Sequence, residues 1–139
     1  MKLGISYNIF DGEELLEESI KSIRNKVDYI SVVYQEISNF GNRCNEGLVP
    51  LLKKLKSDGL IDELYKYKPQ LNSGGHTNEI TKRNIGLFLS EGNGCTHHMA
   101  MDSDEFYTEK QLQYLKETML IEDLDSSACQ MTTYYKEPI

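Results

Sequence analysis

Two carboxylates, Asp102 and Asp104, follow a short apolar run and are separated only by Ser103. Residues i and i+2 of an extended segment point to the same side, so both side chains can converge on one hard metal ion and, through it, on phosphate oxygens. Acidic pairs are also common in ordinary surface turns. The functional weight of this triplet therefore depends on where it falls in the chain.

Other motifs that carry chemistry are missing or weak. The sequence contains no GxxxxGK[ST] phosphate loop, and the glycines of 92–94 precede a predicted strand instead of following one, which excludes the dinucleotide-binding fingerprint. His97 and His98 are adjacent and point to opposite faces of a strand, so at most one could join the two carboxylates, and we expect the inward one to pack. No serine or cysteine stands in a nucleophile elbow.

Composition limits the class of protein. A chain of 139 residues has the length of a single domain. Its composition, with 39% hydrophobic and 27% charged residues, is typical of a globular fold. The net charge of -7 argues against a nucleic-acid partner held by bulk charge. An anionic ligand would need a local cation to enter such a field.

Cysteine usage and hydropathy indicate a cytoplasmic location. The three cysteines, Cys44, Cys95 and Cys129, are odd in number and far apart, which fits reduced thiols better than a disulfide framework. The N-terminus leads straight into a strand-like run, and no apolar stretch reaches the length of a transmembrane helix. These features are also compatible with a protein that contacts a membrane surface peripherally.

Strand-like and helix-like segments alternate along the chain. Short runs rich in β-branched and aromatic residues predict strands at 3–7, 27–34, 60–67, 95–101 and 126–135, the third of them at a sheet edge. Apolar stripes at helical spacing predict helices at 12–25, 46–58 and 77–91 and a fourth that begins after Thr108. We expect capping boxes at Asp11 and Thr108, and a left-handed Gly59 that ends the second helix.

The third helix raises a question about Asn84. Ile80, Leu87 and Phe88 are expected to form its buried side, which would bring Asn84 inside the same arc. A buried asparagine is usually satisfied by neighbouring backbone, and the alternative is that Asn84 braces a loop or ligand at the sheet edge. Lys82 and Arg83 are both expected at the surface as solvated cations.

The alternation is typical of an α/β fold with a doubly wound, mainly parallel sheet and helices on both faces. In such sheets the ligand lies beyond the carboxyl ends of the strands, where the winding reverses. In a strand order of 3-2-1-4, the first and fourth strands are neighbours. Tyr7, Asn8 and the acidic triplet would then meet in one cleft.

These residues, in this order, resemble the N-terminal, nucleotide-sugar-binding part of a glycosyltransferase with the GT-A fold, most like the family-two group. The resemblance covers nearly the whole chain and consists of the 7–8 loop, the helix at 13–23, the segment 82–86 with Gly92 after it, and 102–104. It implies a nucleoside-diphosphate-sugar donor and a divalent cation, Mn²⁺ or Mg²⁺. It also implies a set of site residues: Tyr7, Asn8, Gln35, Arg83, Asn84, Asp102 and Ser103 around the nucleotide sugar, with Asp102 and Asp104 on the metal.

The same resemblance leaves parts of the enzyme unassigned. Many relatives carry an aspartate just after the second strand to read the nucleobase, whereas Gln35 and Glu36 stand nearby in this sequence. Relatives take their general base from a C-terminal acceptor half, so no catalytic base is nominated. We expect residues 1–139 to be a single donor-binding domain without that half. The acceptor is unknown and could be a glycan, a lipid or a protein.

Two other classes of protein remain as alternatives. In a non-catalytic α/β binding or scaffold module, the carboxylates would only cap a turn. A sugar-phosphate nucleotidyltransferase also uses a metal at an α/β sheet, but it would carry a glycine-rich basic loop after the first strand. The corresponding segment, 8–14, is acidic, so this alternative ranks last.

Overall fold

The computed structural model describes residues 1–131. Four strands form one all-parallel sheet in the order β3-β2-β1-β4, as predicted. The strands are β1 (Leu3–Ile9), β2 (Tyr29–Tyr34), β3 (Glu63–Lys66) and β4 (His97–Met101). Because β1 pairs with both β2 and β4, its carboxyl end lies at the point where the direction of winding reverses.

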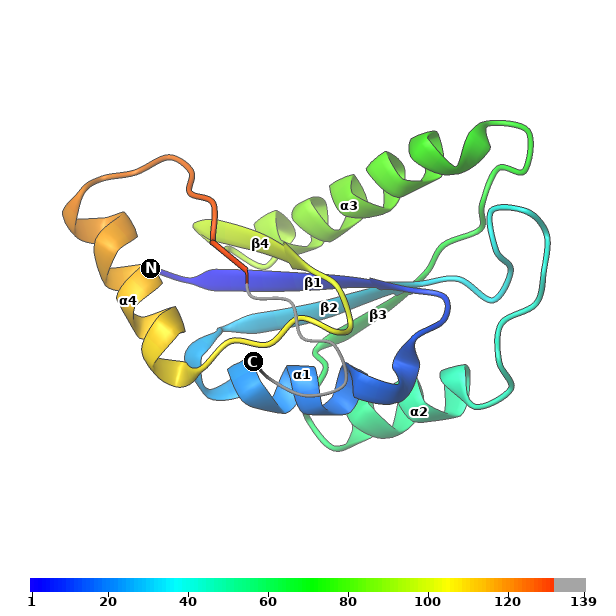
Figure 1. Ribbon diagram of the computed structural model, residues 1–139, viewed down its shortest axis with the longest axis horizontal. Helices are drawn as coiled ribbons and strands as arrows, with labels where there is room; N and C mark the ends of the chain where they lie inside the picture. The colour runs from blue at the N-terminus through cyan, green and yellow to red at the C-terminus, as the bar shows by residue number, and fades with distance from the viewer. Residues whose placement is uncertain (132–139) are drawn as a thin grey trace.

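Helices cover both faces of the sheet. They are α1 (Leu16–Ile23), α2 (Leu48–Ser57), α3 (Gly74–Gly92) and α4 (Glu109–Ile121). Figure 1 shows α1 and α2 together on one face and α3 alone on the other, and the rotated views place α4 beside α1. None of the described helices has the length and apolar character needed to cross a bilayer.

Alternation along β1 divides its side chains between two different environments. Leu3, Ile5, Tyr7 and Ile9 belong to the apolar core shared with α1 and α2. Gly4 and Ser6 contact α3 instead, through Ser90 and Gly86. The face of β1 under α3 therefore carries small and polar residues, and the opposite face carries the large apolar ones.

The burial predicted for α3 is wrong. Ile80, Leu87 and Phe88 are exposed, Phe88 to 64%, and Asn84 is exposed as well. The buried residues are instead Asn78, Lys82, Gly86 and Ser90, spaced four apart. The physical reason is the small side chains beneath the helix, because Gly4 and Ser6 let α3 approach the sheet too closely for large apolar residues at the contact.

Several local predictions can be compared with the structure. The capping box at Thr108 is confirmed in both directions, and Gly59 is left-handed with φ 79°. The capping box at Asp11 is wrong, because Gly12 takes the cap position in a left-handed conformation and a 3₁₀ turn (Glu13–Leu15) precedes α1. No strand forms over 126–131, and the rest of the strand predicted at 126–135 lies outside the described residues.

His98 lies between β4 and α3 and is expected to make stability depend on pH. Its Nδ1 shares a hydrogen bond of 2.8 Å with Ser90 Oγ, and burial lowers its pKa below the usual 6.5. The unfolded chain therefore takes up a proton first as pH falls below 6.5, and stability falls with it. Chemical denaturation of wild type and His98→Gln between pH 5 and pH 7.5 should show the wild type losing more stability on acidification. Parallel pH profiles would contradict this account.

Candidate functional site

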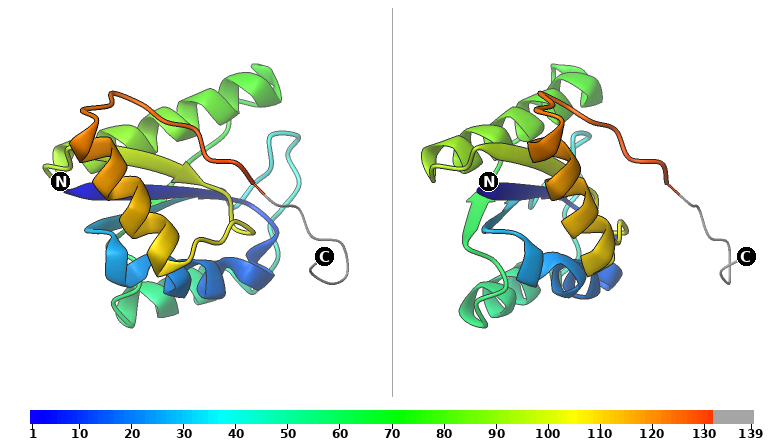
Figure 2. Two further views of the ribbon diagram at one scale, coloured as in Figure 1. Left: turned by 60° about the vertical axis from the view of Figure 1, so that its left-hand side comes forward. Right: turned by 90° about the vertical axis from the view of Figure 1, so that its left-hand side faces the viewer.

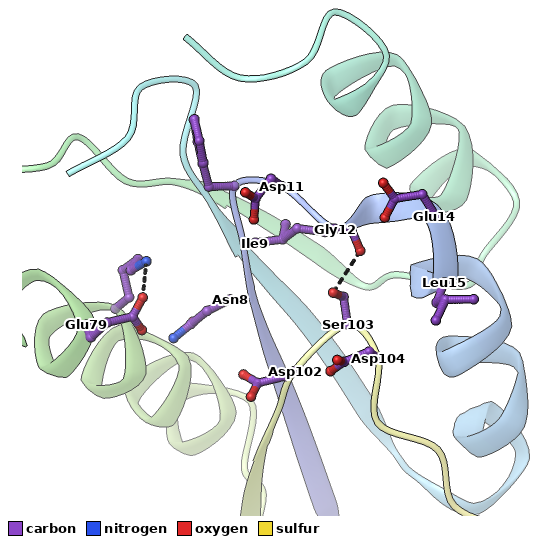
Figure 3. Close-up of a pocket in the computed structure, with 12 residues that line it drawn as sticks. Asn8, Ile9, Asp11, Gly12, Glu14, Leu15, Glu79, Asp102, Ser103 and Asp104 are labelled. Carbon is purple, nitrogen blue, oxygen red and sulfur yellow. Dashed lines mark hydrogen bonds and ion pairs between the residues drawn. The ribbon is translucent and has the colours of Figure 1, made fainter. Parts of the chain in front are cut away.

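A cavity of about 520 Å³ opens at the carboxyl edge of the sheet. Asn8 from β1 and the triplet Asp102, Ser103 and Asp104 after β4 line it, together with the loop that leads into α1 and one side of α3. Figure 3 shows Asn8 directed from the end of β1 toward Glu79 on α3, with the triplet on the loop after β4 beside it. The sequence-based prediction that the ends of the first and fourth strands meet is confirmed for these four residues.

Hydrogen bonds fix the acidic loop against its neighbours. Ser103 Oγ donates to the carbonyl oxygen of Gly12 at 2.9 Å, which ties the loop after β4 to the loop after β1 (Figure 3). The backbone N–H of Glu105 donates to Asp102 O at 3.1 Å and closes a turn. The two carboxylates are thus presented on a short loop whose position is set by β4 and by its contact with Gly12.

Asp102 already has a cationic partner. Arg83 Nη2 on α3 donates to Asp102 Oδ1 at 3.0 Å, and both side chains are about half exposed. An exposed pair of this kind is worth about 0–1 kcal/mol, so a ligand can displace it at little cost. Arg83 is therefore held at the mouth of the cavity, and its guanidinium group stays available to a ligand because the fold depends little on this pair.

The field in the cavity is negative. Five carboxylates line it, from Asp11, Glu14, Glu79, Asp102 and Asp104. Just outside, the pKa of Glu105 is raised, chiefly because its carboxyl is partly buried and then because Asp102 and Asp104 repel its charge. A ligand that carries phosphate would need cations to enter this space.

Lys82 is the only lysine or arginine among the described residues that line the cavity. Its side chain is 4% exposed, and its Nζ donates to Gln35 Oε1 and, at 2.8 Å, to Glu79 Oε1. Gln35 is itself held in place, because its Nε2 donates to Ile37 O and to Asn39 Oδ1. The prediction that Lys82 is a solvated surface cation is wrong.

Asn8 is the least satisfied polar side chain of the site. Its Oδ1 and Nδ2 are both buried, and neither makes a hydrogen bond with any described residue. Buried amides nearly always find partners, because an unmet donor or acceptor costs about 1–3 kcal/mol. An unpartnered amide in a cavity wall is the arrangement expected where a ligand supplies the missing bonds.

The structure separates the predicted site residues into two groups. Asn8, Asp102, Ser103 and Asp104 line the cavity and Arg83 contacts it through Asp102, whereas three other predicted residues do not line it: Tyr7, Gln35 and Asn84.

Physical reasons separate these three from the cavity. Tyr7 is fully buried on the opposite face of β1, where its hydroxyl bonds Ser19 Oγ at 2.9 Å and burial raises its pKa. Gln35 is 1% exposed and lies behind Lys82, and Asn84 lies on the outer side of α3. Tyr7 and Asn8 are adjacent on a strand, so only one of them could reach the cavity.

Four charged residues that line the cavity were missed from the sequence: Asp11, Glu14, Glu79 and Lys82. Asp11 and Glu14 could have been predicted from the sequence, because they lie in the acidic segment that follows Asn8 at the end of the first strand. Lys82 shares a four-residue spacing with Gly86 and Ser90, and small residues at that spacing mark the side of a helix that lies close to a sheet.

Comparison with known proteins does not identify a family. No protein-family model matches the sequence, and no curated protein matches it either.

Proposed function

We propose that the chain is the donor-binding domain of a glycosyltransferase with the GT-A fold, similar to the family-two group, which binds a nucleoside-diphosphate sugar together with Mn²⁺ or Mg²⁺. One observation carries the proposal most strongly. The acidic triplet at the end of β4 lines the same cavity as Asn8 at the end of β1, at the edge where ligands of doubly wound sheets bind.

The donor set of the site fits a hard divalent cation. Asp102 and Asp104 offer carboxylate oxygens on one short loop, and Mg²⁺ is commonly held by one or two carboxylates together with substrate phosphates. Residues 1–131 contain no group of three or more His, Cys, Asp or Glu side chains able to hold a metal ion. We therefore expect the diphosphate to complete the coordination, so that metal and nucleotide bind together.

The cavity's charge supports the same conclusion. When bound, the cation would stabilise the negative charge that develops on the departing diphosphate as the sugar leaves. It would also offset the five carboxylates of the wall, which otherwise repel an anionic donor. Arg83 lies at the mouth, beside Asp102, where it can turn to a phosphate oxygen.

Binding of nucleoside diphosphates with and without metal tests the proposal. Isothermal titration of UDP, CDP, dTDP, GDP and ADP should show binding of at least one of them in 1 mM Mn²⁺ and a loss of about 10-fold or more in EDTA. Titration of the protein with Mn²⁺ alone should give weaker binding than with the nucleotide present. Absence of binding to all five nucleotides in Mn²⁺ would refute the donor-binding function.

A non-catalytic α/β binding or scaffold module remains the second candidate. The acidic loop is also stabilised by contacts within the protein alone. These are the turn closed by Glu105, the Ser103–Gly12 hydrogen bond and the Arg83–Asp102 ion pair. This candidate predicts no thermal shift with any nucleoside diphosphate and metal. The unpartnered amide of Asn8 favours the ligand-binding interpretation over it.

We place the domain in the cytoplasm, with peripheral membrane contact open, as part of the same proposal. The sugar acceptor would be a glycan, lipid or protein, and nucleic acid is not an expected partner of a chain with net charge -7.

A further inference from the structure

We infer that Asn8 and Lys82 form a base-recognition subsite that selects a pyrimidine nucleoside diphosphate over a purine one. The inference rests on the proposed function and deepens it, because it names the class of donor. It follows from three features of the cavity wall between β1 and α3, namely the register of helix on strand, the unused hydrogen-bonding groups, and the local charge.

The register of α3 on β1 places Asn8 beside Lys82. A Cβ on Gly4 would lie 2.7 Å from Ser90 Cβ, and a Cβ on Gly86 would lie 2.5 Å from Ser6 Cβ. A step of two residues along β1 therefore corresponds to a step of four residues along α3. The two steps have similar lengths, about 6.6 Å in a strand and about 6.0 Å in a helix. One further step brings Asn8 opposite Lys82, and both residues line the cavity.

Lys82 has one donor left for a ligand. An ammonium group carries three N–H donors. Two of those on Lys82 donate to Gln35 Oε1 and Glu79 Oε1, and the third is left for a ligand. Its charge is already paired with the Glu79 carboxylate at 2.8 Å. This part of the wall therefore suits a neutral group that accepts a hydrogen bond, and the phosphates belong nearer to Asp102 and Asp104.

Asn8 supplies the two complementary groups. Its amide offers a donor and an acceptor side by side, both buried and both unused within the described residues. In Figure 3 its side chain points from the end of β1 toward Glu79 on α3. One N–H of the Asn8 amide, its oxygen and the free N–H of Lys82 can face one base edge together, so the subsite presents two donors and one acceptor to that edge, in an order that depends on which way the amide is turned.

Each orientation of the amide matches one kind of pyrimidine: the oxygen placed between the two donors suits uracil and thymine, and the nitrogen placed beside Lys82 suits cytosine. Uracil and thymine present acceptor, donor, acceptor, and cytosine presents acceptor, acceptor, donor, so Lys82 can donate to a carbonyl while Asn8 makes both of its bonds. The guanine edge, with one acceptor and two adjacent donors, leaves a donor facing a donor. The adenine edge offers a single acceptor beside a single donor, so one group of the protein stays unmet. A buried unmet group opposes binding.

Titrations of five nucleotides against three proteins test the inference. In Mn²⁺, wild type should bind UDP, CDP or dTDP at least about 10-fold more tightly than GDP and ADP, the effect of one unmet buried group. Asn8→Leu keeps the side-chain shape and removes both polar atoms. Lys82→Met removes the ammonium and keeps the stem. Each variant should weaken pyrimidine binding about 10-fold and leave purine binding within about 2-fold.

The outcomes separate this inference from the proposed function. Equal or tighter binding of GDP or ADP by wild type would overturn the pyrimidine subsite and leave the donor-binding function standing. A pyrimidine preference that persists in both variants would overturn the assignment to these residues. Binding of none of the five nucleotides would overturn both. Asn8→Leu should melt no lower than wild type, because Asn8 makes no hydrogen bond within the described residues, so its loss of binding cannot be ascribed to unfolding.

Discussion

Asp104→Asn is expected to abolish the metal-dependent part of nucleoside-diphosphate binding, with a loss of affinity in Mn²⁺ on the order of 100-fold. The change removes one negative charge and a strong oxygen ligand while keeping the shape of the side chain. Even the loss of a supporting group behind a metal ligand costs about 10-fold to 100-fold, and loss of the ligand itself should cost at least as much. Isothermal titration with and without Mn²⁺ measures the effect.

Asp58→Asn is the matched control for Asp104→Asn. Asp58 follows α2 at the amino edge of the sheet, away from the cavity, and is 50% exposed. It undergoes the same change of charge, so it reports any general effect of lowering the net negative charge. Unchanged Mn²⁺-dependent binding in Asp104→Asn, or an equal loss in both variants, would contradict a role for Asp104 in holding the metal.

Gly86→Ala should destabilise the fold, although alanine is the better helix former by about 1 kcal/mol. Its Cβ would lie 2.5 Å from Ser6 Cβ, an atom fixed to the central strand that cannot swing aside. Overpacking of a close contact costs typically 1–3 kcal/mol, and here α3 must lift from the sheet. We expect a net loss of about 1–2 kcal/mol in denaturant unfolding, together with weaker nucleotide binding because Lys82 and Arg83 move with the helix.

Gly92→Ala provides the control within the same helix. Nothing lies within 4 Å of a Cβ at Gly92, so the substitution should leave stability unchanged or raise it by up to about 1 kcal/mol. Ser6→Gly combined with Gly86→Ala should recover part of the loss, because it removes the atom that the new methyl group meets. A fold as stable in Gly86→Ala as in Gly92→Ala would show that α3 does not depend on this close approach.

The order of the strands could be predicted from the sequence because it depends on patterns that every strand and helix repeats. Alternation of strand-like and helix-like segments indicates right-handed crossovers, and these lead to a parallel sheet with β1 inside it. The meeting of Asn8 with Asp102 and Asp104 follows from that order alone. Local chemistry predicted the capping box at Thr108 for a similar reason, since both bonds lie within four residues.

The orientation of α3 could not be predicted by the same means. Its outer face carries Ile80, Leu87 and Phe88, and hydrophobicity alone would turn these toward the sheet. The deciding information lies in another element, because Gly4 and Ser6 on β1 set how closely a helix can approach. Side-chain size across a contact is a tertiary property, and periodicity within one helix does not contain it.

The placement of Tyr7 illustrates a different kind of error. Strand alternation allows only one of Tyr7 and Asn8 to face the cavity, and the structure turns Tyr7 into the core, where it bonds Ser19. The alternating Leu3, Ile5, Tyr7 and Ile9 already indicate an apolar face to which Tyr7 belongs. The predicted strand ended at residue 7, and this boundary placed Asn8 in a loop and hid the alternation between the two residues.

The most direct measurement is a crystal structure of the protein grown or soaked with UDP and Mn²⁺, with anomalous data collected for manganese. The account predicts a single manganese peak at the end of β4, directly coordinated by a carboxylate oxygen of Asp104, with diphosphate oxygens completing its coordination. It also predicts that the base lies against Asn8. Manganese and nucleotide bound elsewhere on the molecule, with this cavity holding only solvent, would contradict it.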